Sequence, residues 1–259
     1  MNDFRSQHFL VPDWPVASHV KAAISLRTGG FSTEPFASNN LALHVGDKES
    51  NVLLNREALL GSLCVKGWQW LDQVHGVELV EAEASGHIKV ADGCFTRSPN
   101  VVCSVLTADC LPVLMCDKAG KQVLAVHAGW RGLSKGILLK AVRLFTCLPE
   151  EVLVYLGPAI GPKLFEVGGE VRKAFQALAT EFKLVGSAWD SAFSPVEGGR
   201  VEKYLADLYE LARMQLAALR VENVYGGAFC TYSEADKFYS YRRDGVTGRM
   251  ATCIWKNET

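Results

Sequence analysis

The sequence lacks the features that would direct it to a membrane, an export pathway or a polyanion. Its longest stretch without a charged residue covers only the 12 residues 35–46, too few to span a bilayer. The first residues, MNDFRSQH, lack the apolar core of a signal peptide. The 27 Lys and Arg against 28 Asp and Glu leave no basic excess for nucleic acid or an anionic membrane. We therefore expect a cytoplasmic protein that binds neither.

Several motifs of known chemistry are also missing. None of the 8 cysteines forms a CxxC pair, which excludes zinc ribbons and thioredoxin-type redox motifs, and without an export signal no disulfide framework is expected. No P-loop, GxGxxG motif or HxE…PCxxC deaminase signature occurs. A GxSxG match at residues 132–136 is accidental, because the hydrolase fold places its histidine after that serine and all six histidines lie at or before position 127.

The apolar residues follow both strand and helix periods. Short β-branched runs predict six buried strands, at residues 22–26, 101–106, 111–116, 122–126, 152–156 and 221–225. A helical spacing of apolar residues predicts four helices, at residues 51–63, from about 132 to before Pro149, 170–181 and 201–220. The strands between 101 and 126 lie too close for helical crossovers, so part of the sheet should be antiparallel. We expect an α/β fold with a mixed sheet in a single domain over residues 1–259.

Three polar clusters lie where these strands end. They are DQVHG at residues 72–76, TADCLP at 107–112 and VHAGWRG at 126–132. Each supplies one side chain that binds soft or borderline metals, namely His75, Cys110 and His127. Three protein ligands with a fourth position open are the arrangement of a catalytic zinc site, and a His₂Cys set suits zinc or copper. Such a metal lowers the pKa of bound water and polarises a substrate oxygen or nitrogen.

Other interpretations fit the same residues. The spacings between the three clusters match no short metal motif, and histidine and cysteine are common as packing residues. Cys110 could also be a nucleophile with His127 or His75 as its base. In the third cluster, Gly129 and Gly132 permit close approach of a ligand to the backbone, and Arg131 could bind an anion at the start of the following helix.

Several long motifs resemble the YfiH family, also called the laccase-domain or multi-copper polyphenol oxidoreductase family. They extend over nearly the whole chain: SLRTGG at 25–30, NLALHVGD at 40–47, QVHG at 73–76, ADG at 91–93, ADCLP at 108–112, HAGWRG at 127–132, LGPAIGP at 156–162, FEVG at 165–168 and YRRDGVTGR at 241–249. Ala42 stands where the family usually has glycine. The resemblance implies a layered α/β sandwich of the YfiH type.

The resemblance also implies a function. The family's metal ligands are a His, a Cys and a His, which correspond here to His75, Cys110 and His127. Members resemble purine nucleoside enzymes that phosphorolyse adenosine, inosine, guanosine or methylthioadenosine and deaminate adenosine. We therefore expect a zinc-dependent purine nucleoside phosphorylase with adenosine deaminase activity, with nucleoside and phosphate as its small-molecule partners. Alternatives are a copper-dependent polyphenol oxidase, a peptidoglycan-precursor editing factor and a Cys110-dependent hydrolase.

Phosphorolysis requires positive groups that hold phosphate while it attacks C1′ of the ribose. Arg27, His44 and Arg131 are the candidates for this role, because their motif segments could converge on one mouth. Deamination needs a proton shuttle, for which Asp109 is a candidate. Asp109 could equally orient a ligand histidine by hydrogen bonding to it. The preferred nucleoside, the metal and the oligomeric state stay open.

Overall fold

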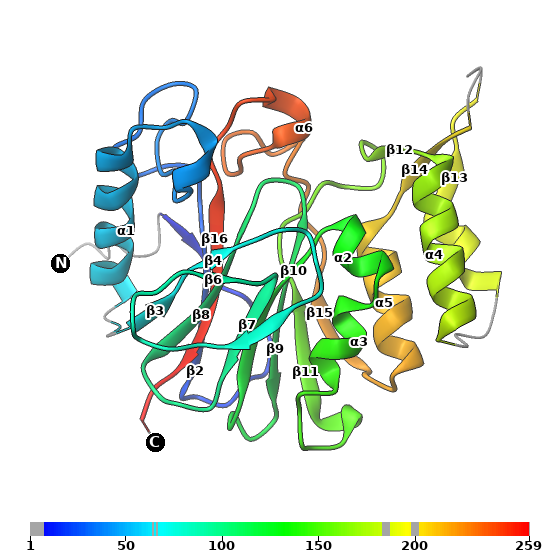
Figure 1. The fold of residues 1–259 in the computed structure, drawn as a ribbon, viewed down its shortest axis with the longest axis horizontal. Coiled ribbons are helices and arrows are strands. Elements are labelled where there is room, and N and C mark those ends of the chain that lie inside the picture. The colour runs from blue at the N-terminus through cyan, green and yellow to red at the C-terminus, as the bar shows by residue number, and fades with distance from the viewer. Residues whose placement is uncertain (1–7, 64, 66, 183–186, 198–201, 259) are drawn as a thin grey trace.

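The computed structural model describes residues 8–63, 65, 67–182, 187–197 and 202–258. Two β-sheets lie face to face, and helices cover the outer side of each sheet (Figure 1). This layered arrangement confirms the mixed α/β fold expected from the sequence. The single domain over residues 1–259 stays a prediction, which the continuous packing of the layers supports.

The first sheet has five strands and includes both the first and the last strand of the described chain. Its order is β1 (Phe9–Leu10), β2 (Val20–Ser25), β16 (Met250–Lys256), β8 (Val101–Thr107) and β3 (Gly67–Gln69). All neighbours are antiparallel except β3 and β8. The C-terminal strand β16 therefore lies at the centre of this sheet, beside β8.

The second sheet has six strands and is also mixed. Its order is β15 (Asn223–Gly226), β11 (Val152–Leu156), β9 (Leu111–Asp117), β10 (Val123–Ala128), β7 (Gly93–Thr96) and β5 (Leu79–Glu81). Strands β9 and β10 form the antiparallel hairpin expected from their short connection. Apart from Asp117 and His127 both strands are apolar, and both are buried along their whole length, because layers of protein cover both faces of this sheet.

The remaining strands form two small sheets. One contains β12 (Glu166–Gly168), β14 (Lys203–Ala206) and β13 (Phe193–Pro195), and the other pairs β4 (Leu71–Asp72) with β6 (Lys89–Val90). The helices are α1 (Glu49–Leu63), α2 (Trp130–Ser134), α3 (Ile137–Val142), α4 (Gly169–Glu181), α5 (Leu208–Ala218) and α6 (Tyr241–Asp244), with 3₁₀ turns η1 (Leu43–Val45), η2 (Pro149–Glu151) and η3 (Ser187–Ala192).

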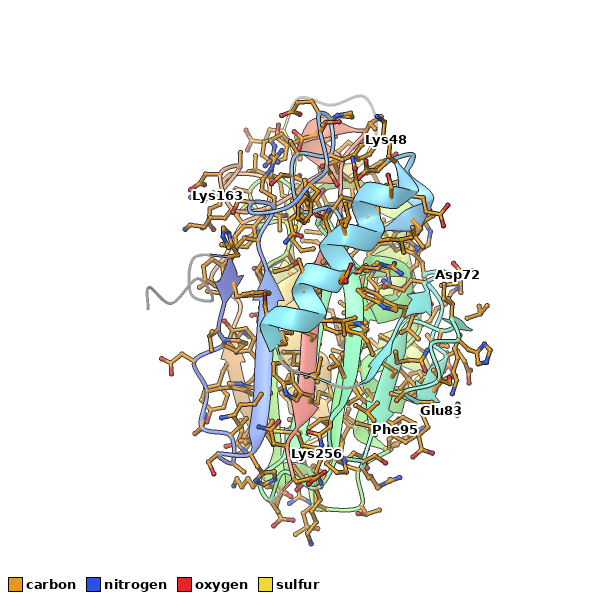
Figure 2. The ribbon with its side chains drawn as sticks, turned by 90° about the vertical axis from the view of Figure 1, so that its left-hand side faces the viewer. Lys48, Asp72, Glu83, Phe95, Lys163 and Lys256 are labelled. Carbon is orange, nitrogen blue, oxygen red and sulfur yellow. The ribbon has the colours of Figure 1, made fainter. Side chains whose placement is uncertain are left out.

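The apolar core is divided among the layers. Side chains such as Ile24 and Leu114 fill the space between the two sheets. Helices α2 and α3, with residues such as Leu138, pack on the outer face of the six-stranded sheet, and α4 packs beyond them, where Phe175 contacts Trp189 and Phe193. Helix α1 lies across the outer face of the five-stranded sheet (Figure 2). Its Leu59 belongs to the same apolar cluster as Trp68 and Trp255. No helix of the described residues is long and apolar enough to cross a membrane.

Two of the expected helices differ from the structure. The helix expected over residues 201–220 is wrong at its beginning: β14 occupies 203–206, and Val201 lies outside the described residues. Helix α5 starts only at Leu208, because the Asp207 side chain accepts hydrogen bonds from the backbone N–H groups of the first turn. The helix expected from about residue 132 is divided into α2 and α3 at Gly136, whose φ of 79° is left-handed.

Candidate metal centre

The three expected metal ligands come together at one end of the sheets. His75 follows β4, Cys110 lies in the turn between β8 and β9, and His127 belongs to the last part of β10. The ligand atoms of the three side chains all lie within 4.8 Å of one another, and Cys110 Sγ is 4.0 Å from His75 Nε2. His127 is buried, Cys110 is half-buried and His75 is exposed. The cluster therefore has a buried side and a side open to solvent.

Asp92, a residue to which the sequence assigned no role, holds both histidines. This carboxylate is fully buried just before β7 and accepts a hydrogen bond from Nδ1 of His127 at 2.8 Å. It also accepts the backbone N–H groups of His75 at 2.9 Å and of Gly76 at 2.6 Å. These contacts stabilise the left-handed backbone of His75, whose φ is 57°. Because Nδ1 of His127 is occupied, Nε2 is the nitrogen available to a metal.

Asp109 fixes the turn that carries Cys110. Its φ of 93° lies in the left-handed region, and its carboxylate accepts hydrogen bonds from Thr231 Oγ1 and from the backbone N–H of Arg242, both at 2.6 Å. The carboxylate therefore connects the Cys110 turn to the beginning of α6. The histidine-orienting contact that was one expectation for Asp109 is made by Asp92 instead.

Two glycines permit the close packing around the cluster. A Cβ atom on Gly129 would lie 3.0 Å from Cys110 Sγ and 3.3 Å from His127 Nε2, so only glycine leaves the space between these atoms open. A Cβ atom on Gly132 would lie 2.7 Å from the carbonyl oxygen of Gly76. The close approach expected at Gly132 is therefore to the His75 turn rather than to a ligand.

The side chains of the cluster shift one another's pKa values. Burial alone would raise the pKa of the Cys110 thiol, but His127 and His75 beside it lower that pKa to about 6. Burial alone would lower the pKa of His127, but the Cys110 thiolate and Asp92 raise it to about 9. The thiol is therefore present as a thiolate near neutral pH, which is the form that binds metal.

A cavity of about 340 Å³ opens beside the cluster. Its lining combines the three ligands with residues from the η1 turn, the segment after β4, β8 and the turn after it, α6 and the segment before β16: His44, Gln73, Leu106, Thr107, Ala108, Tyr241 and Arg249. The volume lies at the lower end of the range usual for small-molecule sites.

The cavity contains an arginine that forms no ion pair with the described residues. Arg249 is half-buried, and its Nη1 donates to the carbonyl oxygens of Thr247 and Gly248. Burial lowers the pKa of Arg249 from the usual arginine value, and the nearby charges of Cys110 and Asp109 oppose this change. The burial of His44, followed by the charge of Arg249, lowers the pKa of His44. His44 is therefore neutral near neutral pH, while Arg249 keeps its charge.

The three residues expected to bind phosphate do not meet at this cavity. His44 lines it, whereas Arg27 and Arg131 do not. The Arg27 guanidinium donates to the carbonyl oxygens of Ala37 and Ala235 and lies 5.0 Å from the centre of the Tyr239 ring. Arg131 lies 4.5 Å from the centre of the Trp130 ring and lines a separate depression between α2 and α4. A phosphate contact by Arg27 or Arg131 stays a prediction.

The donor set fits a single zinc or copper ion. One thiolate and two imidazoles converge, a buried carboxylate fixes one imidazole, and Gly129 leaves the space between the donors open. The exposed side of His75 leaves room for a further ligand from the cavity. Within the described residues, this is the one group of three such side chains whose ligand atoms converge.

The chain is similar to known proteins over almost its whole length. A family model described as multi-copper polyphenol oxidoreductase laccase matches residues 21–257. Purine nucleoside phosphorylase YfiH of Escherichia coli is 48% identical over 249 residues, 95% of this chain and 98% of that protein. A purine nucleoside phosphorylase of Pseudomonas aeruginosa is 47% identical over 247 residues, again 95% of this chain and 98% of the relative.

Solved structures show the same fold. A Neisseria meningitidis protein, 44% identical, superimposes with a TM-score of 0.89 over 97% of this chain and 100% of its own. YlmD from Geobacillus stearothermophilus, 31% identical, has a TM-score of 0.87 over 97% of each chain. These similarities confirm the resemblance seen in the sequence motifs and the layered α/β fold that it implied.

Proposed function

The chain belongs to the family described as multi-copper polyphenol oxidoreductase laccase, and from that membership we propose that it is a zinc-dependent purine nucleoside phosphorylase with adenosine deaminase activity. Two relatives that are nearly half identical to it carry the name purine nucleoside phosphorylase. The observation that carries the proposal is a single cavity lined by both the His75, Cys110 and His127 cluster and an arginine that forms no ion pair with the described residues.

His75, Cys110 and His127 would hold the zinc ion. When bound, zinc supplies a Lewis acid that polarises a substrate oxygen or nitrogen. Asp92 keeps Nδ1 of His127 protonated and so presents Nε2 to the ion. The depressed pKa of Cys110 supplies the thiolate without a large cost of deprotonation near neutral pH.

Phosphate would bind at Arg249, with His44 beside it. An arginine that forms no ion pair with the described residues attracts an anion in a partly desolvated cavity, and its Nη2 can donate to a phosphate oxygen. The neutral His44 ring can donate a further hydrogen bond to the same anion. In the reaction, a phosphate oxygen forms a bond to C1′ of the ribose as the bond from C1′ to the purine nitrogen breaks. Arg249 keeps the negative charge in position for this attack.

The proposal is tested by incubating the zinc-loaded protein with inosine or adenosine, with and without inorganic phosphate. We expect phosphate-dependent release of free purine together with ribose 1-phosphate, and release of ammonia from adenosine. His75→Ala, Cys110→Ala and His127→Ala should lose these activities. Base release of equal rate without phosphate would show a hydrolase instead, and full activity in all three variants would refute the metal assignment.

The family description favours a second candidate, a copper-dependent polyphenol oxidase. A multicopper laccase requires several copper sites, whereas one cluster of three converges in the described residues. We expect phenol oxidation only after copper has replaced zinc at that cluster. Oxidation of a phenolic dye by copper-free protein at the same rate would contradict this expectation, and elemental analysis of the purified protein identifies the resident metal.

A further inference from the structure

Gln73 connects the segments that carry two of the three metal ligands. Its side-chain Nε2 donates to the carbonyl oxygen of Leu106 at 2.9 Å, and its Oε1 accepts from the backbone N–H of Leu106 at 2.7 Å. Gln73 precedes His75 by two residues, and Leu106 precedes Cys110 by four. These two hydrogen bonds, the Gln73 clasp, therefore join the His75 loop to the strand that leads into the Cys110 turn.

The Gln73 clasp lies at an edge of β8 that β3 leaves open. β3 pairs with β8 only from Val101 to Cys103, so within the described residues the last part of β8 has no strand neighbour on that side. There the side-chain amide offers one donor and one acceptor to the backbone of Leu106, as a neighbouring strand would. A side chain of the His75 loop therefore continues the pairing of β8 where β3 has ended.

The position of the His75 ring depends on the backbone of its loop, because the ring is exposed and packing constrains it weakly. The ring contacts the other two ligands: its Nε2 lies 4.0 Å from Cys110 Sγ, and its centre lies 4.8 Å from the centre of the His127 ring. Asp92, just before β7 in the six-stranded sheet, accepts the backbone N–H of His75. The Gln73 clasp attaches the same loop to β8 in the five-stranded sheet.

We propose that Gln73 is a positioning residue of the metal centre, which holds His75 at the distance from Cys110 that a single metal ion requires. The proposal rests on the metal centre of the proposed function and not on its nucleoside chemistry. Because both polar atoms of the Gln73 amide are bonded to Leu106, Gln73 acts through His75 and makes no contact with the reacting atoms. Without the clasp, the exposed His75 is the first ligand to leave the ion.

The test compares Gln73→Met with Gln69→Met. Methionine keeps the length of glutamine and removes both hydrogen-bonding groups. Gln69, on β3, is the matched control: it is fully buried, and its amide donates to two backbone carbonyl oxygens and accepts one backbone N–H, but it does not line the cavity. The melting temperature of the metal-free protein should fall further in Gln69→Met, which loses three hydrogen bonds, than in Gln73→Met, which loses two.

Zinc affinity should show the opposite order. We expect Gln73→Met to weaken zinc binding by roughly tenfold or more, the usual effect of losing a group that orients a metal ligand. Gln73→Asn, whose amide is one methylene shorter and cannot span the same distance, should weaken it in the same direction. Gln69→Met should bind zinc as wild type does. Competition with a chromophoric chelator at neutral pH measures the four affinities.

Cobalt(II) in place of zinc identifies the ligand that moves. Tetrahedral cobalt absorbs more strongly in the visible range than octahedral cobalt, and a cobalt–thiolate bond adds a charge-transfer band. We expect Gln73→Met to keep the charge-transfer band of Cys110 and to lose visible intensity, as His75→Ala does. Loss of the charge-transfer band, as in Cys110→Ala, would show that the clasp holds the Cys110 turn instead and would overturn the assignment to His75.

The remaining outcomes separate this proposal from the proposed function. A wild-type zinc affinity and cobalt spectrum in Gln73→Met would overturn the positioning role and leave the metal centre intact. Equal affinity losses in Gln73→Met and Gln69→Met would show a general loosening of the fold and would overturn it too. If the wild-type protein binds neither metal, the metal centre and the role of Gln73 fail together. Metal binding without phosphorolysis refutes only the proposed reaction, because the affinities and spectra still decide the role of Gln73.

Discussion

The carboxylate of Asp92 accepts a hydrogen bond from Nδ1 of His127 at 2.8 Å, and both side chains are buried. The same carboxylate accepts the backbone N–H of His75. One acid therefore sets the ring orientation of one ligand and the backbone of another. Burial alone would raise the pKa of Asp92, but the hydrogen bonds from His127 and the backbone lower it. The Asp92 carboxylate is therefore ionised in the folded protein near neutral pH.

We predict that Asp92→Asn weakens zinc binding by about 10- to 100-fold, the usual effect of losing a carboxylate that orients a histidine ligand. Competition with a chromophoric chelator near neutral pH measures the affinity. The matched control is Asp117→Asn, because Asp117 is also buried and accepts two backbone N–H groups, from Lys121 and Gln122, but lies away from the cluster. Equal affinity losses in both variants would show a general loss of structure instead.

The same variant should change the dependence of stability on pH. The pKa of Asp92 is lower in the folded than in the unfolded protein, so its contribution is present above the unfolded value of about 4 and disappears as the pH falls through the folded value. The difference in melting temperature between metal-free wild type and Asp92→Asn should therefore narrow in acid. A difference that widens as the pH falls would contradict the lowered pKa.

The Cys110 thiol should react as a thiolate in metal-free protein. With its pKa lowered to about 6, alkylation by iodoacetamide should reach half its maximal rate near pH 6, and His127→Gln should move this midpoint towards the ordinary value of about 8.5. Cys147 is an internal control, since burial and Asp117 raise its pKa. Mass spectrometry of the peptides separates the two cysteines.

Zinc should protect Cys110 from this reaction. If activity survives complete alkylation of Cys110, the residue is not a metal ligand and the centre is wrongly assigned. If activity is lost on alkylation but resists strong chelators, the cysteine hydrolase alternative gains support.

Gly129→Ala should remove metal binding while the fold survives. The φ of Gly129 is −60°, which alanine adopts freely, so the backbone is not strained. The new Cβ would approach Cys110 Sγ to 3.0 Å and displace it by more than the tolerance of about 0.2 Å at a zinc site. The control is Gly61→Ala in α1, where a Cβ meets nothing within 4 Å and should stabilise the helix by about 0.5–1 kcal/mol. Elemental analysis measures the zinc content of both variants. Full zinc occupancy in Gly129→Ala would show that a Cβ atom at this position does not displace Cys110.

Arg249→Gln should raise the KM for phosphate by about tenfold or more, because it removes a charged hydrogen bond to an anion. Initial rates at varied phosphate and saturating inosine measure the change. Arg172→Gln, which breaks an exposed ion pair with Asp190, serves as the control. Arg27→Gln and Arg131→Gln test the other two arginines. A larger rise in phosphate KM in either of these variants than in Arg249→Gln would contradict our assignment.

The local sequence predicted the metal ligands better than the groups that position and complement them. Cys110 and His127 were recognisable because they border predicted apolar strands, and all three side chains, including His75, carry a ligand atom that few other residues offer. Asp92 carries no such signal, since its role depends on a hydrogen bond to a residue 35 positions away. Arg249 reaches the cavity only because β16 pairs with β8, a register that no local pattern reveals.

The helices and strands show the same difference between what the local sequence predicts and what distant contacts decide. Apolar periodicity located the strands of the core, where burial on both faces requires continuous apolar runs. It extended the helix at 201–220 too far, because the apolar residues of β14 continue the helical spacing of α5 by chance. Only the pairing of β14 with β12 and β13 makes that segment a strand.

Asp109 provides a last prediction that separates positioning from proton transfer. Because its carboxylate accepts hydrogen bonds from Thr231 and Arg242, Asp109→Asn should lower the free energy of unfolding by about 1–3 kcal/mol. Activity should fall through displacement of Cys110, with no change in the shape of the pH–rate profile. Thr231→Val, which removes one partner and keeps the carboxylate, should reproduce both effects. A proton shuttle would contribute an ionisation to that profile. If Asp109→Asn abolishes one limb of the profile while Thr231→Val leaves it intact, Asp109 transfers the proton and the positioning role is wrong.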